Sequence, residues 1–172
     1  MKDIILDFAD KLIAGLSQQY YHTVMGQSKG DFTWGSNDKA GTEGFILIQA
    51  YKLTHDKKYM DAALSNLDYL LGRNATGYSF VTGFGDKTPL HLHHRPSAAD
   101  GVREPVPGIL AGGPNFRKED RQEYPSDIPD ECYLDSVKGY ASNENAINWN
   151  ASLTYLAFAI EALQFELGYS GK

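Results

Sequence analysis

The chain has 172 residues, enough for one domain, and its 42% apolar and 22% charged residues are typical of a globular protein. A net charge of −6 argues against a protein that binds nucleic acid through a basic face. No apolar run reaches the roughly eighteen residues that a membrane span requires, so we expect no membrane contact. The first residues are partly acidic, so we expect no signal peptide in this chain, and the single Cys132 excludes an internal disulfide.

Hydrophobic periodicity predicts an all-α protein with four helices, at about residues 3–20, 43–55, 57–71 and 144–167. Thr42 and Asp56 are the expected N-caps of the second and third helices, and Asn143 is that of the fourth. Glu144 would then lie in the first turn of the last helix. The second helix is apolar nearly all round, which indicates that it is buried on most sides.

Residues 72–142 form a long segment with little helical periodicity. All seven prolines of the chain lie in this segment, between Pro89 and Pro129. Short extended pieces are expected at 78–82 and 105–110. A connection of this length is unusual inside a compact domain, and its contents favour a functional loop.

Three histidines and an arginine lie close together in this loop: His91, His93, His94 and Arg95. Neutral imidazoles at short spacing can bind zinc or copper, although the permanent charge of Arg95 would repel a metal ion. Alternatively, the imidazole and guanidinium groups provide fixed donors for the oxygens of a hydroxyl-rich ligand. For any single histidine, a hydrogen bond that pins the loop backbone is a third interpretation.

The segment from Asn143 to Asn150 combines the carboxylate of Glu144 with several amide side chains. Asparagine is unfavourable inside a helix, so this crowding indicates a polar site. A carboxylate among amides and aromatic rings is typical of the proton donor of a glycosidase. The helix dipole would favour the ionised carboxylate, so apolar neighbours such as Trp149 and a second carboxylate such as Asp135 would have to oppose it. Asp135 could equally accept hydrogen bonds from loop backbone N–H groups.

Aromatic side chains are concentrated in the loops and at the helix starts, outside the expected core stripes. They are Trp34, Tyr78, Phe84, Tyr124, Tyr133, Tyr140 and Trp149. Pyranose rings present flat C–H faces that stack on Tyr and Trp, whereas ordinary loop packing explains several of these residues.

Two motifs resemble, in order and spacing, the signatures of glycoside hydrolase family 9, the cellulase and endoglucanase family. The first is Ser79-Phe80-Val81-Thr82-Gly83-Phe84-Gly85-Asp86-Lys87, continuing to His93-His94-Arg95. The second runs from Tyr133-Leu134-Asp135 through Tyr140 and Glu144 to Asn150-Ala151. Trp34-Gly35-Ser36-Asn37 and Gly112-Gly113-Pro114-Asn115 are also similar to the family.

This resemblance implies an α/α barrel of six helical hairpins, of which residues 1–172 would form the C-terminal half with a long irregular active-site loop. It also implies hydrolysis of β-1,4-glucan bonds with inversion, by a secreted or periplasmic enzyme without a cofactor. Glu144 would be the general acid, Asp135 would support it, and His93 would lie beside the cleaved bond. The substrate-binding residues would be Arg95, His94, Trp34, Trp149 and Tyr78. Structural calcium occurs in the family, but no dense acidic loop here indicates a site.

One departure from the family limits the activity that we expect. The catalytic base of the family comes from an Asp-Ala-Gly-Asp type of motif, and this sequence contains none. An inverting mechanism needs that base roughly 6.5–9.5 Å from the acid, with water between them. We therefore expect the isolated chain to hydrolyse little or nothing.

Two other functions remain open at this stage, an oligosaccharide-binding fragment without catalysis and a metalloprotein built on the His cluster. The nearly all-apolar second helix indicates a partner, either the missing N-terminal half-barrel or a second copy in a dimer.

Overall fold

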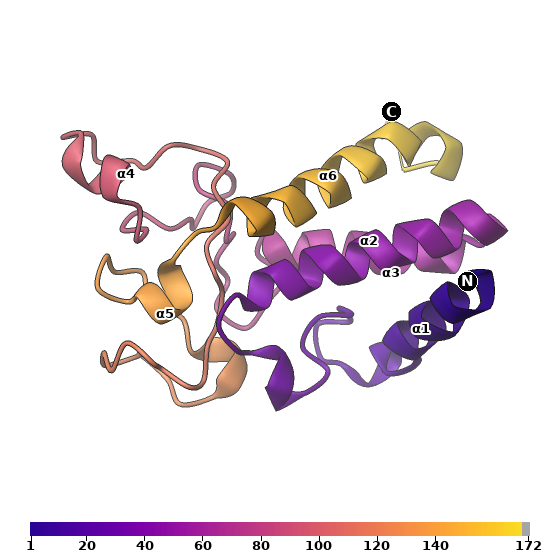
Figure 1. The fold of residues 1–172 in the computed structure, drawn as a ribbon, viewed down its shortest axis with the longest axis horizontal. Coiled ribbons are helices and arrows are strands. Elements are labelled where there is room, and N and C mark those ends of the chain that lie inside the picture. Colours follow the sequence, from indigo (N-terminus) through magenta and orange to yellow (C-terminus); the bar gives the residue numbers. More distant parts are fainter. Residues whose placement is uncertain (170–172) are drawn as a thin grey trace.

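The structure, a computed structural model, describes residues 1–169. Four long helices form one end of the molecule: α1 (Lys2–Ala14), α2 (Ser36–Thr54), α3 (Lys57–Leu70) and α6 (Ile147–Leu167). Two short helices lie in the loops of the other end, α4 (Arg95–Ala99) and α5 (Tyr140–Asn143). Three 3-10 turns complete the regular structure of the described residues, at Leu16–Gln18, Lys29–Asp31 and Pro129–Glu131. Figure 1 shows this division between a helical body and a loop end.

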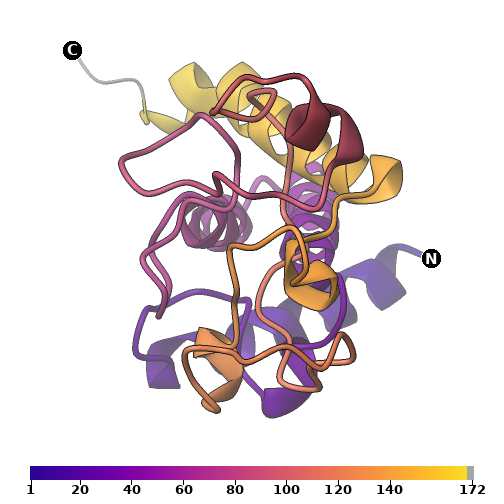
Figure 2. The same cartoon turned by 90° about the vertical axis from the view of Figure 1, so that its left-hand side faces the viewer.

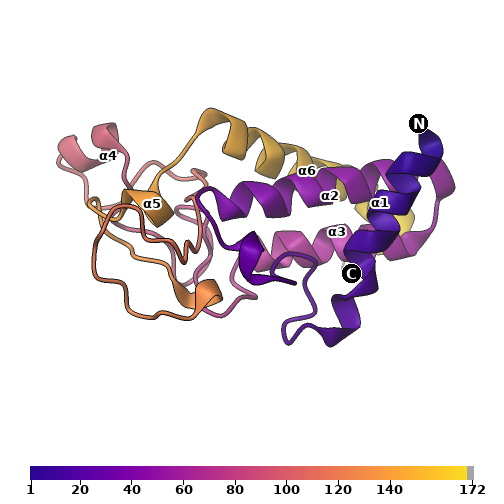
Figure 3. The ribbon, with the colours of Figure 1, turned by 60° about the horizontal axis from the view of Figure 1, so that its bottom comes forward.

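The helical body is organised around α2, which packs against α1, α3 and α6. Its core consists of fully buried side chains from α2, α3 and α6, including Leu47, Ile48, Met60, Leu70 and Leu156. Two glycines let α6 approach α2 closely: a Cβ on Gly44 would lie 2.6 Å from a methyl of Leu156, and one on Gly41 would overlap Ser152. In Figure 3, α1 runs across α2 near the end of the body that is remote from the loops.

The first two helices differ in their bounds from the sequence prediction. The first ends at Ala14 rather than residue 20, because the side chain of Gln27 donates to the carbonyl of Leu12 and occupies the space beside Gly15. The second begins at Ser36 rather than residue 43, so Thr42 lies inside the helix and is not its N-cap.

The early start of α2 has a tertiary cause. Gly35 turns the chain into the helix with a left-handed φ of 76°. The backbone N–H of Asn37 then donates to the carbonyl of Gly112 at 2.9 Å, and its side chain donates to that of Ala111 at 2.8 Å. The first turns of α2 are therefore buried against polar loops and carry no apolar period.

The third helix agrees with the prediction, and the fourth does not at its start. Asp56 accepts a hydrogen bond from the backbone N–H of Lys58 at 3.0 Å, which confirms it as the N-cap of α3. The last helix begins at Ile147, not at residue 144, and Asn143 is the final residue of α5 rather than an N-cap. The side chain of Asn143 bonds elsewhere in the fold and leaves α6 without a side-chain cap.

The long irregular segment between α3 and α6 forms the loop end, which faces the viewer in Figure 2. Val81 and Leu110 form an antiparallel bridge, so the extended pieces expected at 78–82 and 105–110 meet there. A second, parallel bridge joins His93 to Glu144. Buried amides hold the rest: Asn74 donates to the carbonyls of Tyr69 and Tyr78, at 2.7 and 2.8 Å.

Candidate active site

Three segments that are far apart in sequence meet at the loop end. The indole N–H of Trp34, just before α2, donates to Oε2 of Glu144 at 3.0 Å. The backbone N–H of His93 donates to the carbonyl of Asn143 at 2.9 Å, which sets His93 beside Glu144. The ring of Tyr140 packs against both neighbours, with centroids 5.6 Å from Trp34 and 5.8 Å from His93. Together, Trp34, His93, Tyr140 and Glu144 form what we call the acid cluster.

The backbone of Glu144 is held from two sides. Its N–H donates to the carbonyl of Tyr140 at 3.1 Å, and its own carbonyl accepts from the N–H of Gly112 at 2.7 Å. The residue is half-buried and extended, with φ −72° and ψ 162°. It therefore lies before the N-cap of α6, Ala146, and outside the first turn, where the helix dipole acts most strongly. Glu144 is therefore not part of the first turn of α6, where the sequence prediction placed it.

His93 presents one ring nitrogen to the protein and leaves the other available. Its Nδ1 lies 2.5 Å from the carbonyl oxygen of Val137. A carbonyl can only accept, so Nδ1 carries the hydrogen, and Nε2 of the neutral ring is an acceptor. This arrangement suits a ligand hydroxyl that donates to Nε2.

The neighbouring His94 and Arg95 begin helix α4. Nδ1 of His94 accepts from the backbone N–H of Ser97 at 3.4 Å and lies 2.9 Å from its hydroxyl oxygen, so His94 is the N-cap of α4. Arg95 follows as the first residue of the helix and is exposed to solvent. This geometry gives His94 a local structural role through Nδ1, and its predicted contact with substrate stays a prediction.

Asp135 binds the backbone of the His-containing loop rather than Glu144. Its two carboxylate oxygens accept from the N–H groups of Leu90 and His91, at 2.9 and 2.8 Å. The amide of Asn143 approaches the same carboxylate at 3.4 Å. Of the two roles considered for Asp135, the geometry supports the backbone acceptor.

Asn143 connects this loop to the acid cluster. Its Oδ1 accepts from the phenol of Tyr133 at 2.5 Å, and its Nδ2 donates to the carbonyl of His91 at 2.8 Å. Burial holds the pKa of Tyr133 well above its usual range, so the phenol stays a donor. The orientation of the Asn143 amide is therefore fixed on both sides.

The aromatic residues divide between the acid cluster and its support. Trp149 lies directly behind the backbone of the site, since a Cβ on Gly35 would be 2.8 Å from its ring and one on Gly112 would be 3.3 Å away. Tyr78 packs instead against Tyr133, with ring centroids 5.0 Å apart, and beneath the ammonium of Lys87. Trp34 therefore belongs to the acid cluster, Trp149 supports it, and Tyr78 lies in the aromatic packing behind the loop.

Two features of the site go beyond the sequence prediction. Tyr140 has a signal in the sequence, because it lies in the second motif, four residues before Glu144. The contacts of Asn37 with the carbonyls of Ala111 and Gly112 had no sequence signal, because 74 positions separate Asn37 from Ala111.

Residues 1–169 contain no group of three or more His, Cys, Asp or Glu side chains that converge on a metal position. Nδ1 of His93 and of His94 are both engaged by the protein. The part of the chain that the structure describes therefore offers no set of metal ligands for the metalloprotein alternative.

Comparison with known proteins identifies the family. The model of glycosyl hydrolase family 9 matches residues 4–157. The chain belongs to glycosyl hydrolase family 9. Among family 9 relatives, the xyloglucan-specific endo-beta-1,4-glucanase of Bacteroides ovatus is 47% identical over 164 residues, which cover 95% of this chain and 28% of that protein. The cellulose 1,4-beta-cellobiosidase of Acetivibrio thermocellus is 32% identical over 168 residues, covering 90% and 18%.

Solved family 9 structures confirm the fold class. A family 9 structure from Bacteroides ovatus superposes with a TM-score of 0.86 at 45% identity, covering 94% of this chain and 28% of that one. A single mutant of the thermostable endoglucanase from Alicyclobacillus acidocaldarius gives a TM-score of 0.81 at 33% identity, covering 92% and 31%. The protein is thus all-α and matches part of a family 9 barrel, and it spans about a quarter of the length of these relatives.

Proposed function

We propose that the chain is a C-terminal part of a family 9 catalytic domain that supplies the proton donor and part of the sugar-binding surface for β-1,4-glucan hydrolysis. The observation that supports this most directly is the convergence of Trp34, His93 and Glu144, with the indole of Trp34 3.0 Å from Oε2 of Glu144. A carboxyl group beside an aromatic face and an imidazole acceptor can bind a sugar and protonate its leaving oxygen.

The hydrogen bond from Trp34 suggests which carboxyl oxygen does the chemistry. Because the indole donates to Oε2, that oxygen acts as an acceptor, and the proton for transfer would reside on Oε1. Oε1 would give this proton to the glycosidic oxygen as the bond from that oxygen to the anomeric carbon breaks. Water would attack the anomeric carbon from the opposite face and lose a proton to a base. The Trp34 donor would then stabilise the carboxylate that Glu144 has become.

The base for that water is not evident in this chain, since the sequence contains no Asp-Ala-Gly-Asp type of motif. The isolated 172 residues would therefore bind cello-oligosaccharides without cutting them at an appreciable rate. The chain alone would therefore bind oligosaccharides, and hydrolysis would require a second segment that supplies the base.

The test compares the purified chain with Glu144→Gln on a soluble β-1,4-glucan. We expect no release of reducing ends above that of the variant, together with oligosaccharide binding that changes the fluorescence of Trp34 and Trp149. Turnover at the rate of an ordinary cellulase, abolished in the variant, would refute the inactive form of the proposal. Absence of both binding and turnover would refute the proposal altogether.

Exposed aromatic side chains on α6 support the need for a partner. Phe158 and Phe165 are 69% and 78% exposed, and Ile4 on α1 is 73% exposed. We infer that these faces contact the rest of the barrel, or a second copy when the rest is absent. Light scattering on the purified chain distinguishes a monomer from a self-associated dimer.

The substrate class also suggests where the protein acts. Polymeric β-glucans lie outside cells, and we propose that the protein is secreted or periplasmic. Within residues 1–169, no helix combines the length and apolar character that crossing a membrane demands.

A further inference from the structure

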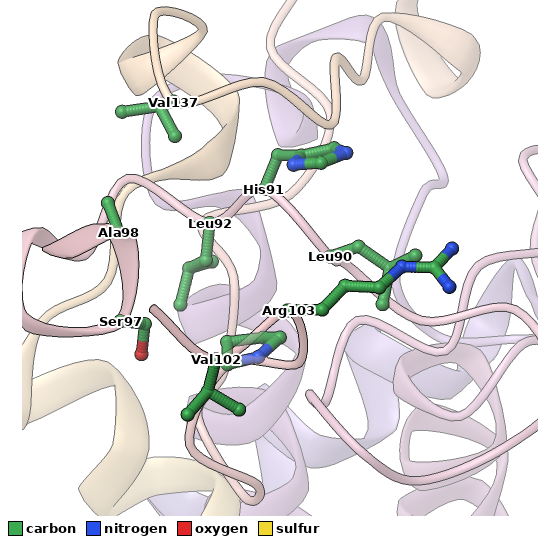
Figure 4. A pocket seen from close by; sticks show the side chains of 9 residues that line it. Leu90, His91, Leu92, Ser97, Ala98, Val102, Arg103 and Val137 are labelled. Atoms are coloured by element: carbon green, nitrogen blue, oxygen red, sulfur yellow. The ribbon is translucent and has the colours of Figure 1, made fainter. Parts of the chain in front are cut away.

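A pocket of about 260 Å³ lies beside the acid cluster and has no part in the chemistry proposed above. Figure 4 shows it between the segment with Leu92, on one side, and helix α4 with the residues after it, on the other. The apolar part of its wall includes the side chains of Leu92, Val102, Pro105 and Val137.

The pocket and the acid cluster share a structural element. Val137 lines the pocket, and its carbonyl accepts the hydrogen bond from Nδ1 of His93 at 2.5 Å. Leu92, also in the wall, directly precedes His93 in the chain. A ligand that contacts His93 would therefore have the pocket next to it.

Two of the polar side chains that line the pocket, His91 and Arg103, can donate hydrogen bonds. His91 and Arg103 are exposed, and in Figure 4 their nitrogen-bearing ends point to the same side. The hydroxyl of Ser97 is already engaged, since it accepts from the N–H of Val106 at 3.2 Å and lies 2.9 Å from Nδ1 of His94. None of the lining residues is acidic.

This chemistry suits one neutral sugar ring. The C–H face of a pyranose can lie on the apolar wall, while its hydroxyl oxygens accept from His91 and Arg103. The volume of about 260 Å³ is below the usual range for drug-sized ligands, so it accommodates one monosaccharide and not a chain. The net charge of −6 disfavours a strongly anionic glycan.

We propose that this pocket is a branch subsite, which takes a single neutral sugar attached as a side group to a β-1,4-glucan whose backbone lies at His93 and Glu144. The inference rests on the proposed function, because the acid cluster must first hold the glucan. The branch subsite would make the protein selective for decorated glucans over unbranched ones.

The test is isothermal titration calorimetry of the full chain with two probes of equal backbone length. One is cellotetraose, and the other is cellotetraose that carries single xylosyl branches. We expect the branched probe to bind about tenfold more tightly, as one or two added hydrogen bonds would allow. Filling the pocket with Val102→Phe should remove this preference and leave the affinity for cellotetraose unchanged.

Val106→Phe is the matched control, because Val106 is an exposed valine of the same loop that does not line the pocket. It should keep the preference. Equal affinity of the wild type for both probes, or a preference that survives Val102→Phe, would overturn the branch subsite while leaving the proposed function intact. If neither probe binds, the proposed function fails and this inference fails with it.

Discussion

The helical body and the loop end of this molecule are held together by different forces. Leu47 and Leu156 of the body are fully buried among other apolar side chains, and α2 and α6 touch closely at Gly44. The loop end instead relies on side-chain amides and carboxylates that bind backbone groups, such as Asn143 and Asp135. Burial of apolar area stabilises the first region, while the second needs each buried polar group to find its partner.

The difference explains why the candidate site lies in the loop end. A hydrogen-bonded loop can present a carboxyl, an imidazole and an indole in one place, because each bond fixes a direction as well as a position. The helical body provides the rigid platform, and Trp149 at the start of α6 connects the two regions by packing against Gly35 and Gly112.

The largest effect is expected from a cavity in the helical body. Leu47→Ala removes a fully buried side chain from α2 and should lower the free energy of unfolding by about 2–5 kcal/mol. Leu53→Ala, near the end of the same helix and 38% exposed, should cost less than about 1 kcal/mol. Urea unfolding measures both. Equal losses for the two variants would show that the core of the body is not where the structure has it.

A buried carboxylate in the body should make its stability depend on pH. Burial raises the pKa of Glu43 to about 7, while a hydrogen bond from Asn66 and the charge of Lys39 oppose the rise and the charge of Asp31 adds to it. Between its ordinary value of 4.5 and about 7, the folded state holds more protons than the unfolded state, so stability falls as pH rises through this window.

Glu43→Gln should remove that dependence, because glutamine does not titrate and can still accept from Asn66. The variant should gain up to about 3 kcal/mol relative to the wild type at pH 8 and little at pH 4. Unfolding curves across this range measure the difference. A wild-type stability that rises between pH 5 and pH 7, with the variant unchanged in slope, would contradict the assignment.

Substitution of Asp135 should destabilise the loop end and leave the core of the helical body intact. Asp135→Ala leaves the N–H groups of Leu90 and His91 without their acceptor and should cost about 2 kcal/mol of stability. Because the same loop carries His93, we also expect weaker oligosaccharide binding in the folded protein. Asp86→Ala, at an exposed site in the neighbouring loop, is the control and should change neither measurement. Unchanged oligosaccharide binding in Asp135→Ala would show that the hydrogen bonds of Asp135 do not position the binding site.

The smallest effect concerns a single hydrogen bond within the acid cluster. Glu144→Gln weakens the acceptor of the Trp34 indole and should shift the indole N–H resonance of Trp34 in a nitrogen–proton correlation spectrum. Trp149, the second tryptophan of the chain, is the internal control, and its resonance should move less. Stability should change by less than about 1 kcal/mol, since Trp34 is an exposed side chain. An unmoved Trp34 resonance would mean that the indole does not bind Glu144.

Sequence patterns predicted the helical body well because its signals are local. The period of apolar residues and the N-cap Asp56 placed α3 within a residue of its observed ends, Lys57–Leu70. The same approach misplaced the start of α2, because Ser36 and Asn37 are buried by loop residues that lie far away in the chain. It also placed Glu144 inside a helix, since nothing near Asn143 in the sequence shows that Tyr133 and His91 occupy its side chain.

The sequence by itself determined the all-α class, the long irregular segment, the family resemblance and the residue types from which a site could be built. Only the tertiary structure decided which of them meet: Trp34, His93 and Glu144 come together, whereas His94 caps α4 and Tyr78 packs against Tyr133. The physical reason is that helix formation depends on neighbours within a turn or two. The direction of a loop side chain depends instead on hydrogen-bond partners that are distant in the sequence and come close only when the chain folds.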